Sequence, residues 1–223
     1  YKGTSLAKQL RELPEYKYTP IIFETALAGE ELSAYRDVKC YSFLVKPFGE
    51  EEFAVAFRDA LGLSKQGYNA FALICRPGDQ TACEDLARAI SFIFENAEEL
   101  EVDTDCYSLW GGSAGARMAA WLGSYGPAAF GGDDLPQPGA VIMQYTGHSD
   151  YTENDPPTFA CSGENDGIAN WRTMQRRLDA MSALGIPTEF HHYPGLPHGF
   201  GLGTGTVAEG WLDEAVAFWE AQR

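Results

Sequence analysis

Strand-like and helix-like hydrophobic patterns alternate along the whole chain. Short apolar runs, typical of buried strands, are separated by segments whose apolar residues recur at three- and four-residue spacing, which indicates amphipathic helices. This alternation predicts an α/β fold with a mostly parallel sheet and helices on both faces. The predicted strands cover residues 20–23, 42–45, 68–75, 105–110, 140–145, 158–162 and 188–193. The predicted helices, counted from their N-caps where present, cover residues 50–61, 81–100, 114–122, 170–184 and 206–219.

Three of these helices begin with capping signals. Asn170 can accept a hydrogen bond from a backbone N–H of the first turn that follows it. Thr81 with Glu84, and Thr206 with Glu209, have the spacing of a capping box. In a capping box, the side chain of each residue accepts a hydrogen bond from the backbone N–H of the other residue. The chain shows no repeats and no long linker, so its 223 residues predict one large domain or two small ones.

Composition excludes several classes of function. Apolar residues make up 45% of the chain, enough for a sizeable core, and the net charge of −16 would repel a phosphate backbone, which argues against nucleic-acid binding. No apolar stretch approaches the roughly 20 residues that cross a bilayer. The N-terminus lacks a signal-peptide pattern, so we expect a cytoplasmic protein without a membrane partner. It also lacks a starting Met, which leaves the true N-terminus open.

The five cysteines are an odd set without CxxC spacing. We expect reduced thiols rather than a disulfide framework or a zinc site, and the sequence therefore suggests no metal centre. These residues are Cys40, Cys75, Cys83, Cys106 and Cys161.

The segment Gly111-Gly112-Ser113-Ala114-Gly115 has the G-x-S-x-G pattern and lies between a predicted strand and a predicted helix. Such a strand–turn–helix arrangement lifts a serine hydroxyl above the sheet, and its sharp turn excludes side chains two residues before and after the serine. We interpret Ser113 as a nucleophile and the Ala114 N–H, at the positive end of the helix, as one oxyanion donor. The alternative is a glycine-rich turn that only packs closely or binds an anion.

His198 is the candidate general base among the four histidines. It lies in a loop bounded by Gly and Pro directly after the last predicted strand, and an imidazole can act as a base near neutrality. His191 and His192 lie within that strand. After an elbow serine, the α/β-hydrolase order is nucleophile, acid and then histidine, and His148 precedes the acid candidate, Asp166. The alternative is a surface histidine without a role.

Asp166 is the candidate acid that would orient the base. It directly follows the predicted strand at 158–162, with room for one helix and one strand before His198. Glu164 shares the loop and stays open as a rival. The alternative for Asp166 is a residue that only starts the helix after Asn170.

From about residue 67 onward, these motifs resemble α/β-hydrolase esterases of the acetyl-xylan and feruloyl esterase type. The resemblance rests on residues 67–71, residues 84–90, the 110–116 elbow and the loops of Asp166 and His198. Those esterases are similar to the hormone-sensitive-lipase branch and, more remotely, to prolyl-oligopeptidase-like peptidases. The resemblance implies a serine esterase that hydrolyses acyl esters, such as acetyl or feruloyl esters of carbohydrate, without a cofactor.

Residues 1–63 depart from those esterases and resemble the C-terminal half of a response-regulator receiver domain. The matching pieces are residues 3–7, 20–26 and 40–48. Thr25 would match the switch threonine, and Lys46 the lysine before a cis-proline. The phosphoacceptor aspartate and acidic metal ligands of receivers would precede Gly3 and are absent from the chain, so phosphorelay signalling is not expected.

The two resemblances together predict a chimera, natural or engineered, of a receiver-like fragment at 1–63 and a catalytic portion at 64–223. The esterases normally have earlier strands and a His-Gly-Gly-Gly loop that supplies a second oxyanion donor, and this chain has no such loop. We hypothesise that residues 21–23 or 42–45 fill the vacant place beside the strand before the elbow and complete one sheet. The loop at 25–27 could then donate the missing N–H.

The segment between the elbow helix and the next strand, residues 122–140, is short and contains a loop rich in Gly, Pro and Asp. No large apolar lid is expected, so short acyl esters fit better than lipids, and Ser113 would form an acyl-enzyme. Two rivals stay open, namely a serine peptidase of the same fold and a catalytically impaired structural fusion. An incomplete sheet would expose an edge strand, so besides a small-molecule ester we consider a homodimer partner.

Overall fold

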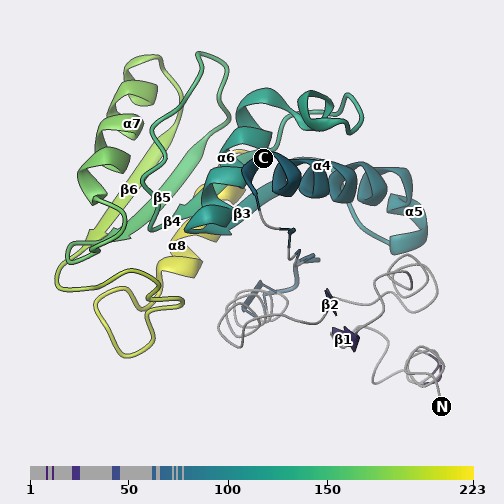
Figure 1. The fold of residues 1–223 in the computed structure, drawn as a ribbon, viewed down its shortest axis with the longest axis horizontal. Helices are drawn as coiled ribbons and strands as arrows, with labels where there is room; N and C mark the ends of the chain where they lie inside the picture. The colour runs from purple at the N-terminus through teal and green to yellow at the C-terminus, as the bar shows by residue number, and fades with distance from the viewer. Residues whose placement is uncertain are drawn as a thin grey trace. The chain divides into compact units, whose positions relative to one another are not determined.

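The computed structural model describes residues 9, 12, 22–25, 42–45, 62, 63, 66–71, 73, 75, 76 and 78–223 (Figure 1). The chain divides into two compact units. One comprises Tyr1–Ile74 and Glu98–Val102, and the other comprises Cys75–Ala97 and Asp103–Arg223. The predicted helix at 50–61 lies outside the described residues. The predicted division at residues 63 and 64 stays a prediction.

The first unit contains two strands at places where the sequence predicted strands, and they pair in parallel with each other. Strand β1 (Ile22–Thr25) pairs with β2 (Ser42–Val45), with Ile22 opposite Ser42 and Thr25 opposite Val45. β1 begins two residues later than predicted, and β2 has the predicted bounds. Of the rest of the proposed receiver-like fragment, only residues 9, 12, 62 and 63 are described.

The strand predicted at residues 68–75 is wrong for the residues that the structure describes there. Residues 68–71, 73 and 75 have no strand conformation. A strand is held by a ladder of hydrogen bonds to a neighbour, and no described strand pairs with this segment. Two of its described apolar side chains, Phe71 and Leu73, are each 37% exposed.

The second unit is built on a four-stranded parallel sheet in the order β3-β4-β5-β6. The strands are β3 (Ser108–Gly112), β4 (Ala140–Gln144), β5 (Thr158–Gly163) and β6 (Thr188–Tyr193). Every residue of β4 and β5 is buried, as expected for central parallel strands, and neither sequence alternates regularly between apolar and polar residues. All four strand predictions are confirmed, although β3 starts later than expected and continues through two glycines.

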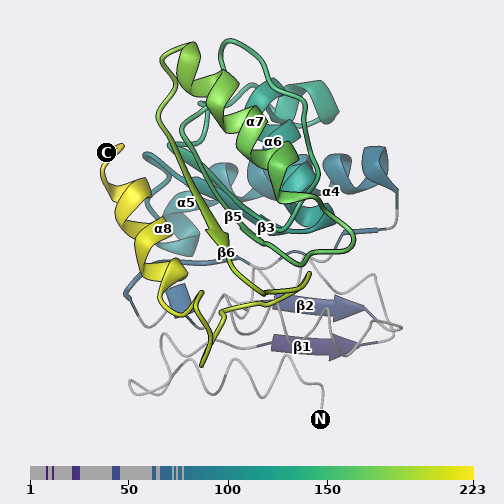
Figure 2. The ribbon, with the colours of Figure 1, turned by 90° about the vertical axis from the view of Figure 1, so that its left-hand side faces the viewer.

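Helices cover both faces of this sheet. The helices of the second unit are α4 (Asp79–Glu95), α6 (Ala114–Tyr125), the 3₁₀ helix η3 (Pro127–Phe130), α7 (Trp171–Ala183) and α8 (Trp211–Glu220). A short helix, α5 (Ala97–Leu100), follows α4. Figure 2 shows α6 and α7 on one face of the sheet and α8 on the other. The predicted α/β class, with a parallel sheet between two layers of helices, is therefore confirmed.

The capping predictions divide into one success and two errors. The Asn170 side chain accepts a hydrogen bond from the Arg172 N–H, as expected for an N-cap. Neither capping box starts a helix, because α4 begins after Gly78 and α8 begins after Gly210. Both glycines have positive φ angles, 102° and 97°, which a residue without Cβ adopts at little cost.

The second predicted capping box closes a turn instead. Glu209 accepts a hydrogen bond from the Gly205 N–H at 2.8 Å, and the Thr206 hydroxyl accepts one from the Ala208 N–H at 3.2 Å. The two side chains thus satisfy backbone groups in the loop ahead of α8. The helix start predicted from this spacing is therefore wrong, and the two side chains stabilise a turn instead.

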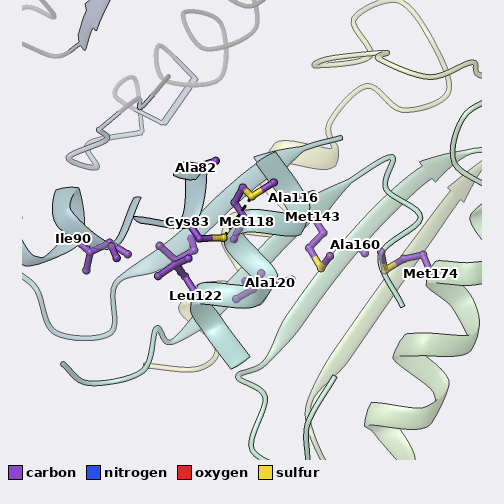
Figure 3. Close-up of a cluster of buried hydrophobic side chains, with 14 of the residues drawn as sticks. Ala82, Cys83, Ile90, Ala116, Met118, Ala120, Leu122, Met143, Ala160 and Met174 are labelled. Atoms are coloured by element: carbon purple, nitrogen blue, oxygen red, sulfur yellow. Dashed lines mark hydrogen bonds between the residues drawn. The ribbon is translucent and has the colours of Figure 1, made fainter. Parts of the chain in front are cut away.

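Small residues on α6 let this helix pack closely on the sheet. A Cβ on Gly123 would lie 2.7 Å from a methyl group of Val141 on β4, so only glycine fits there. Figure 3 shows the core between α4, α6 and the strands, where the Cys83 thiol lies 3.6 Å from the Met118 sulfur. The fully buried members of this core include Cys83, Ala87, Ala116, Leu122, Met143 and Ala160.

The four described cysteines, Cys75, Cys83, Cys106 and Cys161, are free thiols. Within the described part of the chain, no helix is long and apolar enough to cross a membrane.

In the part of the chain that the structure describes, β1 and β2 form one sheet and β3 to β6 another. The hypothesis that residues 21–23 or 42–45 complete the sheet beside β3 stays a prediction.

Candidate active site

Ser113 lies in the sharp turn between β3 and α6, as predicted. Its φ of 54° and ψ of −116° are unusual for a residue with a side chain, and such strain is typical of functional turns. The strained turn is held by a hydrogen bond of 3.0 Å from the Ser113 N–H to the main-chain oxygen of Gln144, the last residue of β4. The half-buried serine is therefore fixed to the central part of the sheet.

The two outer glycines of the elbow differ in what they permit. A Cβ on Gly111 would lie 2.3 Å from the Gly115 carbonyl group, a distance that real side chains do not show. A Cβ on Gly115 would meet nothing within 4 Å. The expectation that the turn excludes both side chains is therefore right for Gly111 and wrong for Gly115, because α6 turns the second position toward open space.

The structure brings the three predicted side chains together in one hydrogen-bonded chain. His198 Nε2 lies 2.9 Å from Ser113 Oγ, and His198 Nδ1 lies 2.8 Å from Asp166 Oδ2. These residues lie after three different strands, β3, β5 and β6, at the carboxyl edge of the sheet. Because the strands are parallel, loops that are far apart in the sequence meet at this edge.

The Asp166 carboxylate is held by its own loop. Its side chain is fully buried, and Oδ1 accepts hydrogen bonds of 2.8 Å from the backbone N–H groups of Ile168 and Ala169. These bonds leave Oδ2 facing His198, so the carboxylate fixes the orientation of the ring. Glu164, the rival acid, instead lies 4.0 Å from His192 Nε2 on the neighbouring strand.

The remaining histidines lie apart from Ser113. His191, on β6, places its Nε2 2.6 Å from Glu189 and its Nδ1 3.5 Å from Glu214. His148 is buried in the loop after β4, where its ring packs edge-on against Trp121 with centroids 5.5 Å apart. Burial, together with the positive charge of Arg177, lowers the pKa of His148 to about 4. This ring is therefore neutral in ordinary buffers.

Ala114 is the first residue of α6 and is exposed to solvent. N–H groups in the first turn of a helix lack partners within the helix, and the helix dipole makes this end positive. Ala114 is therefore suited to donate to a developing oxyanion, and that role stays a prediction. The predicted second donor, at residues 25–27, involves Ala26 and Leu27, which lie outside the described residues.

Sequence reasoning missed two residues that surround this chain of hydrogen bonds. The Tyr145 ring packs edge-on against the His198 ring with centroids 5.0 Å apart, and its backbone has a positive φ of 33°. The side-chain amide of Gln144 is buried and donates to the Gly201 carbonyl at 3.1 Å. A polar residue that ends an apolar strand at the carboxyl edge was the available signal for Gln144.

This arrangement can perform acyl transfer. The imidazole can remove the proton from the Ser113 hydroxyl, while the buried carboxylate orients the ring and stabilises the imidazolium that forms. Among the described residues, no group of three or more His, Cys, Asp or Glu side chains could hold a metal ion.

Comparison with known proteins finds one matching family model and many structures of similar fold. Residues 65–134 match the family model BD-FAE, a segment that includes the elbow serine. No curated protein matches the chain. The solved structures include an α/β-hydrolase enzyme that matches 95% of this chain with a TM-score of 0.63. The chain has an α/β-hydrolase fold.

Three solved structures illustrate the similarity. MGS-M1, an α/β-hydrolase enzyme from a Medee basin deep-sea metagenome library, is 20% identical, with a TM-score of 0.63 over 95% of this chain and 88% of that one. An acetyl ester-xyloside bifunctional hydrolase from Caldicellulosiruptor lactoaceticus is 19% identical, with a TM-score of 0.64 over 91% and 83%. Thermogutta terrifontis esterase 2 with bound butyrate is 19% identical, with a TM-score of 0.63 over 91% and 82%.

Neither the matching family model nor these three proteins is a receiver domain. The receiver resemblance of residues 1–63, and with it the chimera, therefore stays a prediction.

Proposed function

We propose that this protein is a serine esterase that hydrolyses short acyl esters, such as acetyl or feruloyl esters of carbohydrate. The observation that carries the proposal is the continuous hydrogen-bonded chain from Asp166 through His198 to Ser113. A buried carboxylate, a partly exposed imidazole and a serine in a strained turn are the groups that nucleophilic acyl transfer requires.

The proposed reaction has two steps. In the first, Ser113 Oγ attacks the ester carbonyl while His198 takes the hydroxyl proton, and the developing oxyanion faces the Ala114 N–H. His198 then returns the proton to the leaving alcohol, which leaves an acyl group on Ser113. In the second step, His198 activates a water molecule that attacks the acyl group and releases the acid. No metal or cofactor takes part in this scheme.

Two comparisons support an ester as the substrate. The family model BD-FAE matches residues 65–134, which contain the elbow, although not the loops of Asp166 and His198. Two of the structurally similar proteins are named as an acetyl ester-xyloside hydrolase and as an esterase with bound butyrate. The short connection from α6 to β4, which holds only η3 and a loop, favours small acyl groups over lipids.

The test compares wild-type protein with Ser113→Ala on p-nitrophenyl acetate and on aminoacyl anilides. We expect hydrolysis of the acetate to fall by at least about 10³-fold in the variant and the anilides to react poorly with both proteins. An organophosphonate should label Ser113 stoichiometrically, as seen by mass spectrometry of the intact protein.

A matched control is Ser162→Ala. The Ser162 hydroxyl is buried and has no hydrogen-bond partner, so its removal should leave the rate unchanged. Equal rates for wild type and Ser113→Ala would refute the esterase and favour an impaired fusion. Faster cleavage of anilides than of the acetate would favour a peptidase.

A further inference from the structure

Gln144 connects the nucleophile and the base through two different groups. Its main-chain oxygen accepts the hydrogen bond of 3.0 Å from the Ser113 N–H. Its side-chain Nε2 donates a hydrogen bond of 3.1 Å to the carbonyl oxygen of Gly201, three residues after His198. The side chain is 2% exposed, so water does not compete strongly for this bond. One buried residue therefore holds both the serine turn and the histidine loop.

The loop that carries His198 depends on such an anchor because its backbone is rich in glycine. Gly199, Gly201, Gly203 and Gly205 all have positive φ angles. Glycine loses more conformational freedom on ordering than any other residue, so this loop is costly to hold in one conformation. The Gly201 carbonyl receives a second hydrogen bond, of 3.0 Å, from the indole Nε1 of Trp211 on α8. Two buried donors thus converge on a single carbonyl in the loop.

We propose that Gln144 is a positioning residue that aligns His198 with Ser113 by holding the Gly201 carbonyl. The inference rests on the proposed function, since it concerns the same base and nucleophile. In this role Gln144 neither donates a hydrogen bond to the reacting atoms nor accepts a proton from them. It acts through the loop that carries His198 and Gly201. A displacement of about 1 Å at a reacting group can cost roughly 10²-fold in rate, so this anchor has a measurable consequence.

The test is Gln144→Met, which keeps an unbranched side chain of similar volume and removes the amide donor. We expect kcat on p-nitrophenyl acetate to fall about 10- to 100-fold while KM changes less than about threefold, because alignment of the base affects the chemical step. The main-chain bond to Ser113 is retained in this variant. Trp211→Phe, which removes the other donor, provides a second variant and should also lower kcat.

A matched control separates positioning from stability alone. Thr158→Val removes another buried side-chain bond to a backbone carbonyl, from the Thr158 hydroxyl to Pro156 at 2.9 Å, on β5 and away from the histidine loop. It should lower the midpoint of thermal unfolding and leave kcat within about twofold of the wild type. Gln144→Met should lower kcat far more than Thr158→Val does, even where the two variants lower the midpoint of thermal unfolding by the same amount.

A spectroscopic readout reports on the alignment directly. The proton shared by His198 Nδ1 and Asp166 should give a low-field proton NMR resonance, assigned by its absence in Asp166→Asn. We expect this resonance to broaden or shift in Gln144→Met and to persist in Thr158→Val. An unchanged resonance and an unchanged kcat in a folded Gln144→Met protein would overturn the inference. Should the wild type lack Ser113-dependent hydrolysis, the proposed function fails, and the resonance alone still decides whether Gln144 positions His198.

Discussion

The Leu196 carbonyl oxygen lies where a side chain on Gly163 would have to be, since a Cβ built there would be only 2.2 Å away. Gly163 ends β5 just before the Asp166 loop, and Leu196 lies two residues before His198. The Asn165 N–H donates a hydrogen bond of 2.9 Å to the same oxygen. The acid loop and the base loop therefore meet backbone against backbone, and this contact sets the distance between their side chains.

We predict that Gly163→Ala separates the two loops. The new methyl group must displace backbone atoms rather than a flexible side chain, and overpacking of this kind typically costs about 1–3 kcal/mol. The rate of ester hydrolysis should fall by roughly 10² because His198 moves relative to its partners. Gly167→Ala, in the same acid loop, is the control, since a Cβ there meets nothing within 4 Å. Similar kcat/KM values for the two variants would contradict the prediction.

A second prediction concerns which carboxylate serves the base. In Asp166→Asn, an NH2 group replaces one of the two carboxylate oxygens. This NH2 group must face either the backbone N–H groups of the loop or the His198 ring, and in both places the native partner is an acceptor. We expect kcat to fall by about 10³- to 10⁴-fold, as expected when the ring is held in the wrong tautomer. Glu164→Gln should change kcat less than about twofold, because Glu164 faces His192. A large loss in Glu164→Gln would assign the role to the rival acid.

The sequence predicted the central strands of the second unit's sheet well because β4 and β5 are buried on both faces. β4 and β5 are short runs of mostly apolar residues that follow Gly139 and Pro157, so local pattern and tertiary burial agree. β6 is more polar and only partly buried, and its bounds were predictable from Pro187 and Pro194 on either side. The segment at 68–75 is also mostly apolar and has no strand in its described residues. Composition cannot supply the neighbouring strand that a ladder needs, which is why this prediction failed.

The same contrast holds for the candidate site. Ser113, Asp166 and His198 were predictable because each follows a strand, and because strand order alone brings such loops to one edge. For Gln144 the sequence signalled only a polar residue at the end of an apolar strand, not the partner of its side chain, and for Tyr145 it gave no signal. The bond from Gln144 joins residues 57 positions apart, and Tyr145, whose ring contacts His198, has a positive φ that the sequence does not signal. Contacts of this kind are set by the packed fold rather than by local pattern.

A third prediction uses the two glycines of the elbow. Gly111→Ala should abolish activity and destabilise the protein, since its methyl group would overlap the Gly115 carbonyl group in the first turn of α6. Gly115→Ala meets open space, and an alanine in a helix is favoured over glycine by roughly 0.5–1 kcal/mol. We therefore expect Gly115→Ala to unfold at the same or a higher temperature. A destabilised Gly115→Ala protein would restore the expectation that both positions exclude side chains.

His148, in the loop after β4, is the buried titratable group whose pKa shift has the clearest consequence for stability. Arg177 bridges this loop, with an ion pair of 2.8 Å to Asp155 and a hydrogen bond of 2.7 Å to the main-chain oxygen of Asp150. Burial and the charges of Arg177 and Arg117 lower the pKa of His148, and the nearby carboxylates of Asp150 and Asp155 oppose them in part. The buried His148 Nε2 has no hydrogen-bond partner that would favour its protonation.

We predict that His148 makes the protein sensitive to acid between about pH 6.5 and pH 4. The pKa of His148 falls from 6.5 in the unfolded chain to about 4 in the folded protein, so in this window the unfolded state binds an extra proton. Its contribution to stability is complete above pH 6.5 and is lost as the pH falls, by at most about 1.4 kcal/mol per pH unit. In urea titrations, His148→Phe should show a correspondingly shallower pH dependence than the wild type in this window and a parallel one above it. Parallel curves throughout would show that His148 titrates normally in the folded protein.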